Sequence, residues 1–104
     1  MHGHSFRIEV QLLGEADPQT GILLDFGEVK RIVKPYIDLL DHWCINDVAE
    51  RDGIDLLRNP TSENLARWYY ETLQPLLPAL YCVVVHETCT SRCAYSSARH
   101  FLPA

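Results

Sequence analysis

Residues 2–13 read HGHSFRIEVQLL, and their pattern decides the first element of the fold. The even positions carry histidine or apolar side chains, whereas the odd positions from Ser5 to Gln11 are polar. A period of two residues is typical of a strand that buries one face. The sequence therefore predicts a half-buried β-strand over residues 2–13, with His2 and His4 on its apolar side.

The next predicted elements are a helix and a long loop. Asp25 followed by Glu28 is the pattern of a helix N-cap with a reciprocal carboxylate, and apolar residues then recur at helical spacing as far as Leu40. Pro35 lies within this helix and is expected to kink or split it. Residues 41–59 show no sustained period and are expected to form an ordered loop of the kind that often carries function.

A second helix and two strands follow. Thr61 has the position of a helix N-cap, and Pro75 and Pro78 are expected to end the helix. Its predicted buried side consists of Leu65, Trp68, Tyr69, Leu73 and Leu76. Residues 80–88 and 92–100 are expected to form strands, and residues 22–24 a short one.

This order of elements predicts an α+β fold with an antiparallel four-stranded sheet and two helices on one face. So small a sheet leaves open edges, and a chain of 104 residues has a limited core. Both features favour a symmetric homo-oligomer in which sheets join across subunits.

Composition limits the possible functions. Residues 1–104 form one expected domain, with 47% hydrophobic and 22% charged residues, a balance typical of a globular protein. The formal net charge is -5 and the nine Lys and Arg residues are scattered, which gives no support for a nucleic-acid-binding groove. There is no apolar stretch of membrane-spanning length and no pattern of a secretory signal, so we expect a cytoplasmic protein without a membrane partner.

The four cysteines, Cys44, Cys82, Cys89 and Cys93, are expected to be reduced in that compartment. The favoured interpretation is that they are small buried hydrophobic residues. A metal cluster of His86, Cys89 and Cys93 is a weaker alternative, because the spacing lacks a C-x-x-C pair.

Two pairs of residues are candidates for chemistry. His2 and His4 lie on one side of a strand and could chelate one metal ion, although a catalytic zinc usually has three protein ligands; they could also be ordinary polar residues near a terminus. Asp41 and His42 follow a predicted helix and suit proton transfer, with a helix C-cap histidine and a solvated carboxylate as the alternative.

Glu87 is a third candidate because it continues the apolar face of its strand. A carboxylate there needs a partner if it is buried, and it can accept two parallel hydrogen bonds from an edge such as that of a pterin or guanine. It could equally reach solvent from the strand end. Thr61 and Ser62 are best explained as helix-capping residues, with ligand contact as a second possibility.

Several ordered motifs together resemble the 6-pyruvoyltetrahydropterin synthase family, and in particular its bacterial branch of 6-carboxytetrahydropterin synthases in the queuosine pathway. These motifs are His2-Gly3-His4-Ser5-Phe6, residues 22–30 (ILLDFGEVK), Leu40-Asp41-His42, Asn46-Asp47, residues 59–64 (NPTSEN) and residues 86–90 (HETCT). The resemblance covers nearly the whole chain.

The resemblance implies a tunnelling fold, in which antiparallel sheets close into a barrel through trimers that stack as a hexamer. It implies that His2 and His4 are two of three zinc-binding histidines, that Asp41 and His42 are a catalytic pair, and that Glu87 anchors the pterin ring. The implied cofactor is Zn²⁺, and the implied substrate is 7,8-dihydroneopterin triphosphate, which is converted to 6-carboxytetrahydropterin.

The chain departs from the family pattern at its start. The family has a catalytic cysteine four residues before the first histidine of His-Gly-His and a third zinc-binding histidine further upstream, whereas this sequence has only Met1 before His2. The expected domain is therefore an N-terminally shortened one, and Cys44 is a weak candidate for a replacement base. Alternative functions are a pterin-binding oligomer without turnover and a structural subunit that pairs with a complete homologue.

Overall fold

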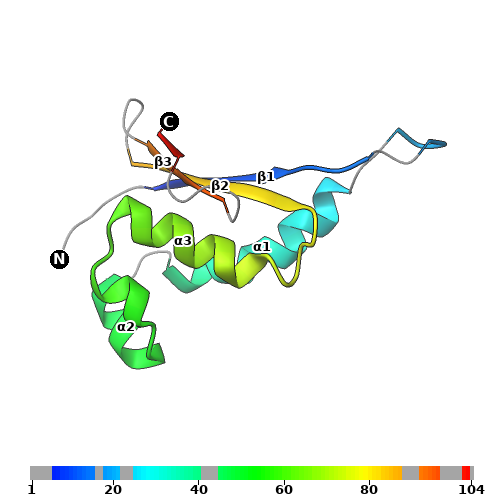
Figure 1. The fold of residues 1–104 in the computed structure, drawn as a ribbon. Helices are drawn as coiled ribbons and strands as arrows, with labels where there is room; N and C mark the ends of the chain where they lie inside the picture. The colour runs from blue at the N-terminus through cyan, green and yellow to red at the C-terminus, as the bar shows by residue number, and fades with distance from the viewer. Residues whose placement is uncertain are drawn as a thin grey trace.

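A computed structural model describes residues 6–15, 18–21, 25–40, 45–87, 92–96 and 102–103 of the chain. Figure 1 shows a sheet with the helices on one side of it. The elements in chain order are β1 (Arg7–Leu12), α1 (Phe26–Leu40), α2 (Ile45–Asp52), the 3₁₀ helix η1 (Asp55–Arg58), α3 (Ser62–Leu73), β2 (Leu80–His86), β3 (Arg92–Tyr95) and β4 (Leu102–Pro103).

The strands form an antiparallel sheet in the order β1-β2-β3-β4, which confirms the predicted α+β class. In the register, Val84 of β2 lies between Glu9 of β1 and Ala94 of β3. Residues directly opposite each other in a sheet point to the same face. The register therefore fixes which side chains of the three strands share a face.

One face of the sheet packs against the helices. The even positions of β1, from Phe6 to Leu12, pack against a core cluster that contains Val83 and Val85 of β2. This confirms the alternation predicted for β1 over its described residues. A second, smaller cluster of buried residues consists of Cys82, Val84 and Ala94, and by the register it lies on the face away from the helices.

Helix α3 supplies the main helical side of the core. Thr61 is its N-cap, as predicted, and the Thr61 Oγ1 atom accepts a 3.1 Å hydrogen bond from the backbone N–H of Asn64. The buried residues of the helix are Leu65, Ala66, Tyr69, Tyr70 and Leu73. The prediction that Leu76 is buried is wrong, since its side chain is 46% exposed. The reason is that α3 ends at Leu73, before the helical phase reaches Leu76.

Helix α1 begins as predicted, because the Asp25 Oδ1 atom accepts a 3.2 Å hydrogen bond from the backbone N–H of Gly27. Glu28 does not form the expected reciprocal bond, since its recorded partner is Arg31. Pro35 does not split the helix, which is one element from Phe26 to Leu40. Pro35 is exposed, while the apolar stripe of α1, for example Val33 and Ile37, packs against the core and favours the continuous helix.

The prediction of a loop over residues 41–59 is wrong from residue 45 onward, and residues 41–44 lie outside the described residues. This stretch contains α2 and η1, which bury Val48, Ala49 and Leu57. Helix α2 is too short to show a sustained period, but its end has a recognisable signal. Gly53 has a φ of 68°, and the Ile54 N–H donates a 2.8 Å hydrogen bond to the Ala49 carbonyl, which is a Schellman ending.

The C-terminal strands differ from the prediction in their limits. The strand expected over residues 80–88 ends at His86. The strand expected over residues 92–100 is described as Arg92–Tyr95, and a separate strand, Leu102–Pro103, pairs with it. The short strand predicted at residues 22–24 lies outside the described residues. Within the described part of the chain, every helix is too short or too polar to cross a membrane.

Candidate functional site

Glu87 and Ser62 are brought together where the end of β2 meets the start of α3. Glu87 directly follows β2 and continues the alternation of Val83 and Val85, whose side chains face the helices. The Ser62 Oγ atom donates a hydrogen bond of 3.2 Å to the Glu87 Oε2 atom. The two residues are 25 positions apart in the sequence, so the fold places them side by side.

The Glu87 carboxylate is exposed, which agrees with the alternative that it reaches solvent from the strand end. The strand ends one residue earlier, and the carboxylate therefore lies beyond the packed part of the sheet. An ionised carboxylate has two oxygens and about four acceptor positions. Since Ser62 occupies one of them, Glu87 retains the capacity to accept two parallel hydrogen bonds from a ligand edge.

Thr61 has a structural role in this site. Its hydroxyl oxygen is the cap of α3, and its backbone N–H donates a 2.8 Å hydrogen bond to the Asn59 carbonyl. The Asn64 side chain donates to the same carbonyl at 2.7 Å. These bonds fix the turn that precedes α3 and, with it, the position of Ser62. The capping interpretation is confirmed for Thr61, whereas Ser62 is the residue that contacts Glu87.

The start of α3 also provides a favourable field for a negative charge. The first backbone N–H groups of a helix lack helical partners and carry a partial positive charge. Glu87 lies against the first residue of α3 through its bond to Ser62. The site therefore combines a carboxylate acceptor, a hydroxyl that holds it, and the positive end of a helix.

The other predicted site residues, His2, His4, Asp41 and His42, lie outside the described residues, as does Cys44. The structure consequently does not test whether they approach Glu87. Imidazole nitrogen is a donor that suits zinc, so the chemistry of His2 and His4 fits the expected ion. In the described ranges, no group of three His, Cys, Asp or Glu residues is arranged to hold a metal.

The alternative metal cluster of His86, Cys89 and Cys93 is wrong in geometry. Cys93 lies opposite Val85 and shares its face, whereas the next residue, His86, points to the other side of the sheet. Cys89 lies outside the described residues. Cys82 and Cys93 are buried and free, and burial raises the pKa of both thiols. Their predicted role as small buried residues is therefore confirmed.

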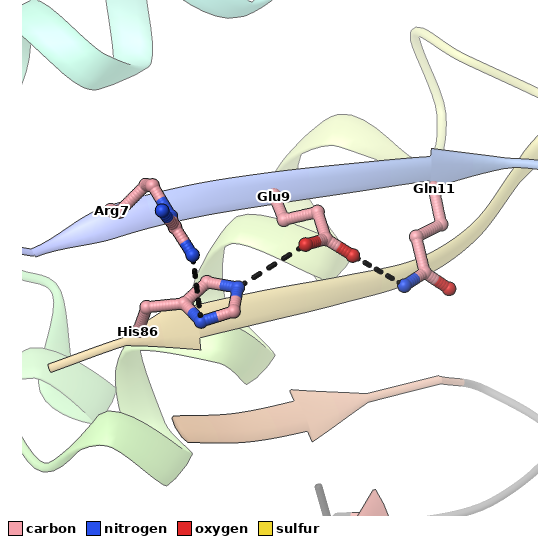
Figure 2. A network of polar contacts seen from close by, with 4 residues as sticks. All are labelled: Arg7, Glu9, Gln11 and His86. Atoms are coloured by element: carbon pink, nitrogen blue, oxygen red, sulfur yellow. Dashed lines mark hydrogen bonds and ion pairs between the residues drawn. The ribbon is translucent and has the colours of Figure 1, made fainter. Parts of the chain in front are cut away.

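A polar network around His86 occupies the face away from the helices (Figure 2). The sequence suggested His86 as a possible metal ligand but did not indicate this network. The His86 Nε2 atom lies 3.2 Å from the Glu9 Oε1 atom, and an Arg7 Nη2 atom lies 3.4 Å from His86 Nδ1. Gln11 completes the row with a 2.6 Å hydrogen bond to the second Glu9 oxygen. The sequence signal was the polar alternation of Arg7, Glu9 and Gln11, but the partner strand was not evident from it.

Known proteins are similar to this chain in sequence and in fold. Residues 1–98 match the family 6-pyruvoyl tetrahydropterin synthase. The 6-carboxy-5,6,7,8-tetrahydropterin synthase of a Synechocystis strain is 36% identical over 95% of this chain and 77% of its own length. The dihydroneopterin monophosphate aldolase of Pyrococcus furiosus is 35% identical over 75% of this chain and 60% of its own length.

The comparison with solved structures agrees with the sequence comparison. The solved structure of Caenorhabditis elegans 6-pyruvoyl tetrahydropterin synthase superimposes with a TM-score of 0.80 at 28% identity, over 92% of this chain and 69% of the other. The architecture is thus the tunnelling fold of pterin-processing enzymes, as expected. The chain belongs to the 6-pyruvoyl tetrahydropterin synthase family. It spans between 60% and 77% of the length of the two relatives named above.

Proposed function

We propose that the chain is a lyase of the 6-carboxy-5,6,7,8-tetrahydropterin synthase type, which converts 7,8-dihydroneopterin triphosphate in queuosine biosynthesis. Family membership supports a pterin-processing role, and relatives from Synechocystis and Bacillus subtilis carry the name of this synthase. Relatives with other names, an aldolase and 6-pyruvoyl tetrahydrobiopterin synthases, make the exact product part of the proposal.

The observation that carries the proposal is the contact between Ser62 and Glu87. A pterin ring presents a ring N–H and an adjacent amino group, which form two parallel donors on one edge. The exposed Glu87 carboxylate can accept both, because Ser62 occupies only part of its acceptor capacity. In this role Glu87 binds and orients the ring, and Ser62 restricts the carboxylate to one orientation.

Proton transfer is assigned in this proposal to Asp41 and His42. A histidine beside a carboxylate can take up and return a proton near neutral pH. The reaction requires removal of protons from the side-chain carbons of the substrate, loss of triphosphate, and addition of one water at the carbon next to the ring, so that cleavage of its C–C bond releases acetaldehyde and leaves a carboxyl group. A zinc ion held by His2 and His4 would polarise the side-chain oxygens and make those protons more acidic.

Pterin affinity tests the role of Glu87. We expect Glu87→Gln to weaken binding of 7,8-dihydroneopterin by on the order of tenfold to a hundredfold, because the amide replaces one carboxylate oxygen by an NH2 donor, which faces one of the two parallel donors of the ring. Ser62→Ala should weaken binding less, by several-fold, since it removes only the bond that orients Glu87. Isothermal titration calorimetry measures both effects.

The matched control is Glu71→Gln, which neutralises an exposed carboxylate in α3 that pairs with Arg67. It should leave pterin affinity unchanged. Equal affinity of the Glu87→Gln variant and the unaltered protein would contradict the proposed ring-binding role. Pterin binding without any product would instead favour the alternative of a pterin-binding oligomer without turnover.

A further inference from the structure

The face of the sheet away from the helices carries a row of basic side chains across three adjacent strands. In the register, Arg7 of β1 lies opposite His86 of β2, and His86 lies opposite Arg92 of β3. Side chains that face one another across antiparallel strands point to the same side. The contact between Arg7 and His86 shows this directly on the β1 side (Figure 2).

Arg92 belongs to the same surface. Its positive charge contributes to lowering the pKa of Glu9, the carboxyl group that contacts His86. Arg7 and Arg92 are both exposed, whereas His86 between them is only 7% exposed. Two exposed guanidinium groups therefore flank a buried imidazole on one face.

The spacing of the row suits an anion with more than one phosphoryl group. Neighbouring strands lie about 4.8 Å apart, which places the α-carbons of Arg7 and Arg92 about 10 Å apart. A guanidinium group binds phosphate oxygens through two parallel N–H donors and keeps its charge at every physiological pH. Two such groups that reach inward over His86 can each hold one phosphoryl group of the same ligand.

The existing contacts leave these donors available. The distance of 3.4 Å between Arg7 and His86 Nδ1 is long for a hydrogen bond, so Arg7 loses little when it turns towards a ligand. Among the described residues, Glu9 is the carboxylate that contacts this row, and its hydrogen bonds are to His86 and Gln11 and not to either arginine. Among the described residues, no ion pair is recorded for Arg7 or Arg92.

The charge of the row also differs from that of the molecule. The chain has a formal net charge of -5, yet two arginines lie on one row, and within the described ranges the carboxylate that contacts this row is that of Glu9. Two guanidinium groups and one carboxylate give the described row a local positive charge, which a bound anion would compensate.

We propose that Arg7, His86 and Arg92 form a binding site for an oligophosphate group on the sheet face away from the helices. Glu87 lies against α3 on the opposite side, so this site is separate from the proposed pterin-ring contact and does not depend on it. Arg7 and Arg92 bind the phosphoryl oxygens. The Nε2–H group of His86 donates a hydrogen bond to the Glu9 carboxylate and thereby keeps this carboxylate away from the two guanidinium groups.

Titration of the full chain with sodium pyrophosphate and tripolyphosphate, at constant ionic strength, tests the proposal. We expect measurable binding of both by calorimetry, and a loss of affinity of on the order of tenfold or more in Arg92→Gln and in Arg7→Gln. Arg92→Lys should retain part of the affinity, because lysine keeps the charge but lacks the two parallel donors.

Arg67→Gln is the matched control, since it removes an exposed arginine from α3 on the other side of the sheet. It should bind pyrophosphate as the unaltered chain does, and thermal unfolding should confirm that every variant is folded. Absence of binding to the unaltered chain, or equal losses in Arg67→Gln and Arg92→Gln, would overturn the proposal. Dihydroneopterin, which lacks phosphate, should bind the Arg92→Gln variant as it binds the unaltered chain. The test of the phosphate site is therefore independent of the test of pterin binding by Glu87.

Discussion

Single residues define two different polar environments at the end of β2. His86 and Glu87 are consecutive, but His86 contacts Arg7 and Glu9 on one face whereas Glu87 contacts Ser62 on the other. The donors and acceptors around His86 favour one neutral tautomer. A guanidinium group only donates, so Nδ1 accepts, and a carboxylate accepts, so Nε2 carries the hydrogen.

The lowered pKa of Glu9 predicts that the stability of the fold depends on pH. Hydrogen bonds from Gln11 and His86, together with the nearby positive charge of Arg92, lower the pKa of Glu9 from its ordinary value of 4.5. A carboxyl group whose pKa is lower in the folded state than in the unfolded state stabilises the fold at pH values above the ordinary pKa. This contribution is lost as the pH falls through the lowered pKa of the folded state. The stabilisation by Glu9 is therefore present at neutral pH and disappears below about pH 4.5.

We expect Glu9→Gln to unfold at lower urea concentration than the unaltered protein at pH 7, with the difference shrinking as the pH falls below 4.5. The effect at neutral pH should be modest, because the Glu9 side chain is 45% exposed. Glu50→Gln, at an exposed position of α2, is the control and should show a smaller difference. A difference for Glu9→Gln that grows as the pH falls would contradict this explanation.

At the scale of elements, the cap of α3 connects the stability of the helix with the geometry of the site. Thr61→Ala removes the acceptor for the Asn64 N–H and should lower the free energy of unfolding by about 1 kcal/mol. Thr61→Ser keeps the acceptor and should retain most of the stability. Chemical denaturation measures both values, and equal losses in the two variants would show that the cap hydrogen bond contributes little.

Elements with a long or strongly marked pattern could be predicted from the sequence. The alternation along β1 extends over several residues, and α3 begins with a recognisable cap at Thr61. Helix α2 was missed because two turns cannot establish a period, and only Gly53 at its end marks it. Leu76 was misassigned because apolar spacing alone does not reveal where a helix ends.

The candidate site could be predicted only in part. The position of Glu87 beyond an apolar row was visible in the sequence, and so was the start of a helix at Ser62. The contact between Glu87 and Ser62 was not visible in the sequence, because it depends on how β2 and α3 pack. The network of His86 was missed for the same reason, because the pairing of β1 with β2 joins residues 77 and 79 positions apart.

At the scale of the whole molecule, the described chain is elongated, with extents of 49, 27 and 23 Å. Strands β1 and β4 are the two outer strands of the described sheet. Unpaired strand edges can accept strands from another chain. A trimer or hexamer of this chain and a cytoplasmic location both stay predictions.

Turnover tests the central claim most directly. Purified chain with one equivalent of zinc is incubated with 7,8-dihydroneopterin triphosphate, and mass spectrometry follows 6-carboxytetrahydropterin and its 6-pyruvoyl relative. We expect the carboxy product, with a marked loss in His42→Ala and in Glu87→Gln and none in Glu71→Gln. Absence of both products from a folded, pterin-binding chain, or equal product from His42→Ala, would contradict the proposed lyase.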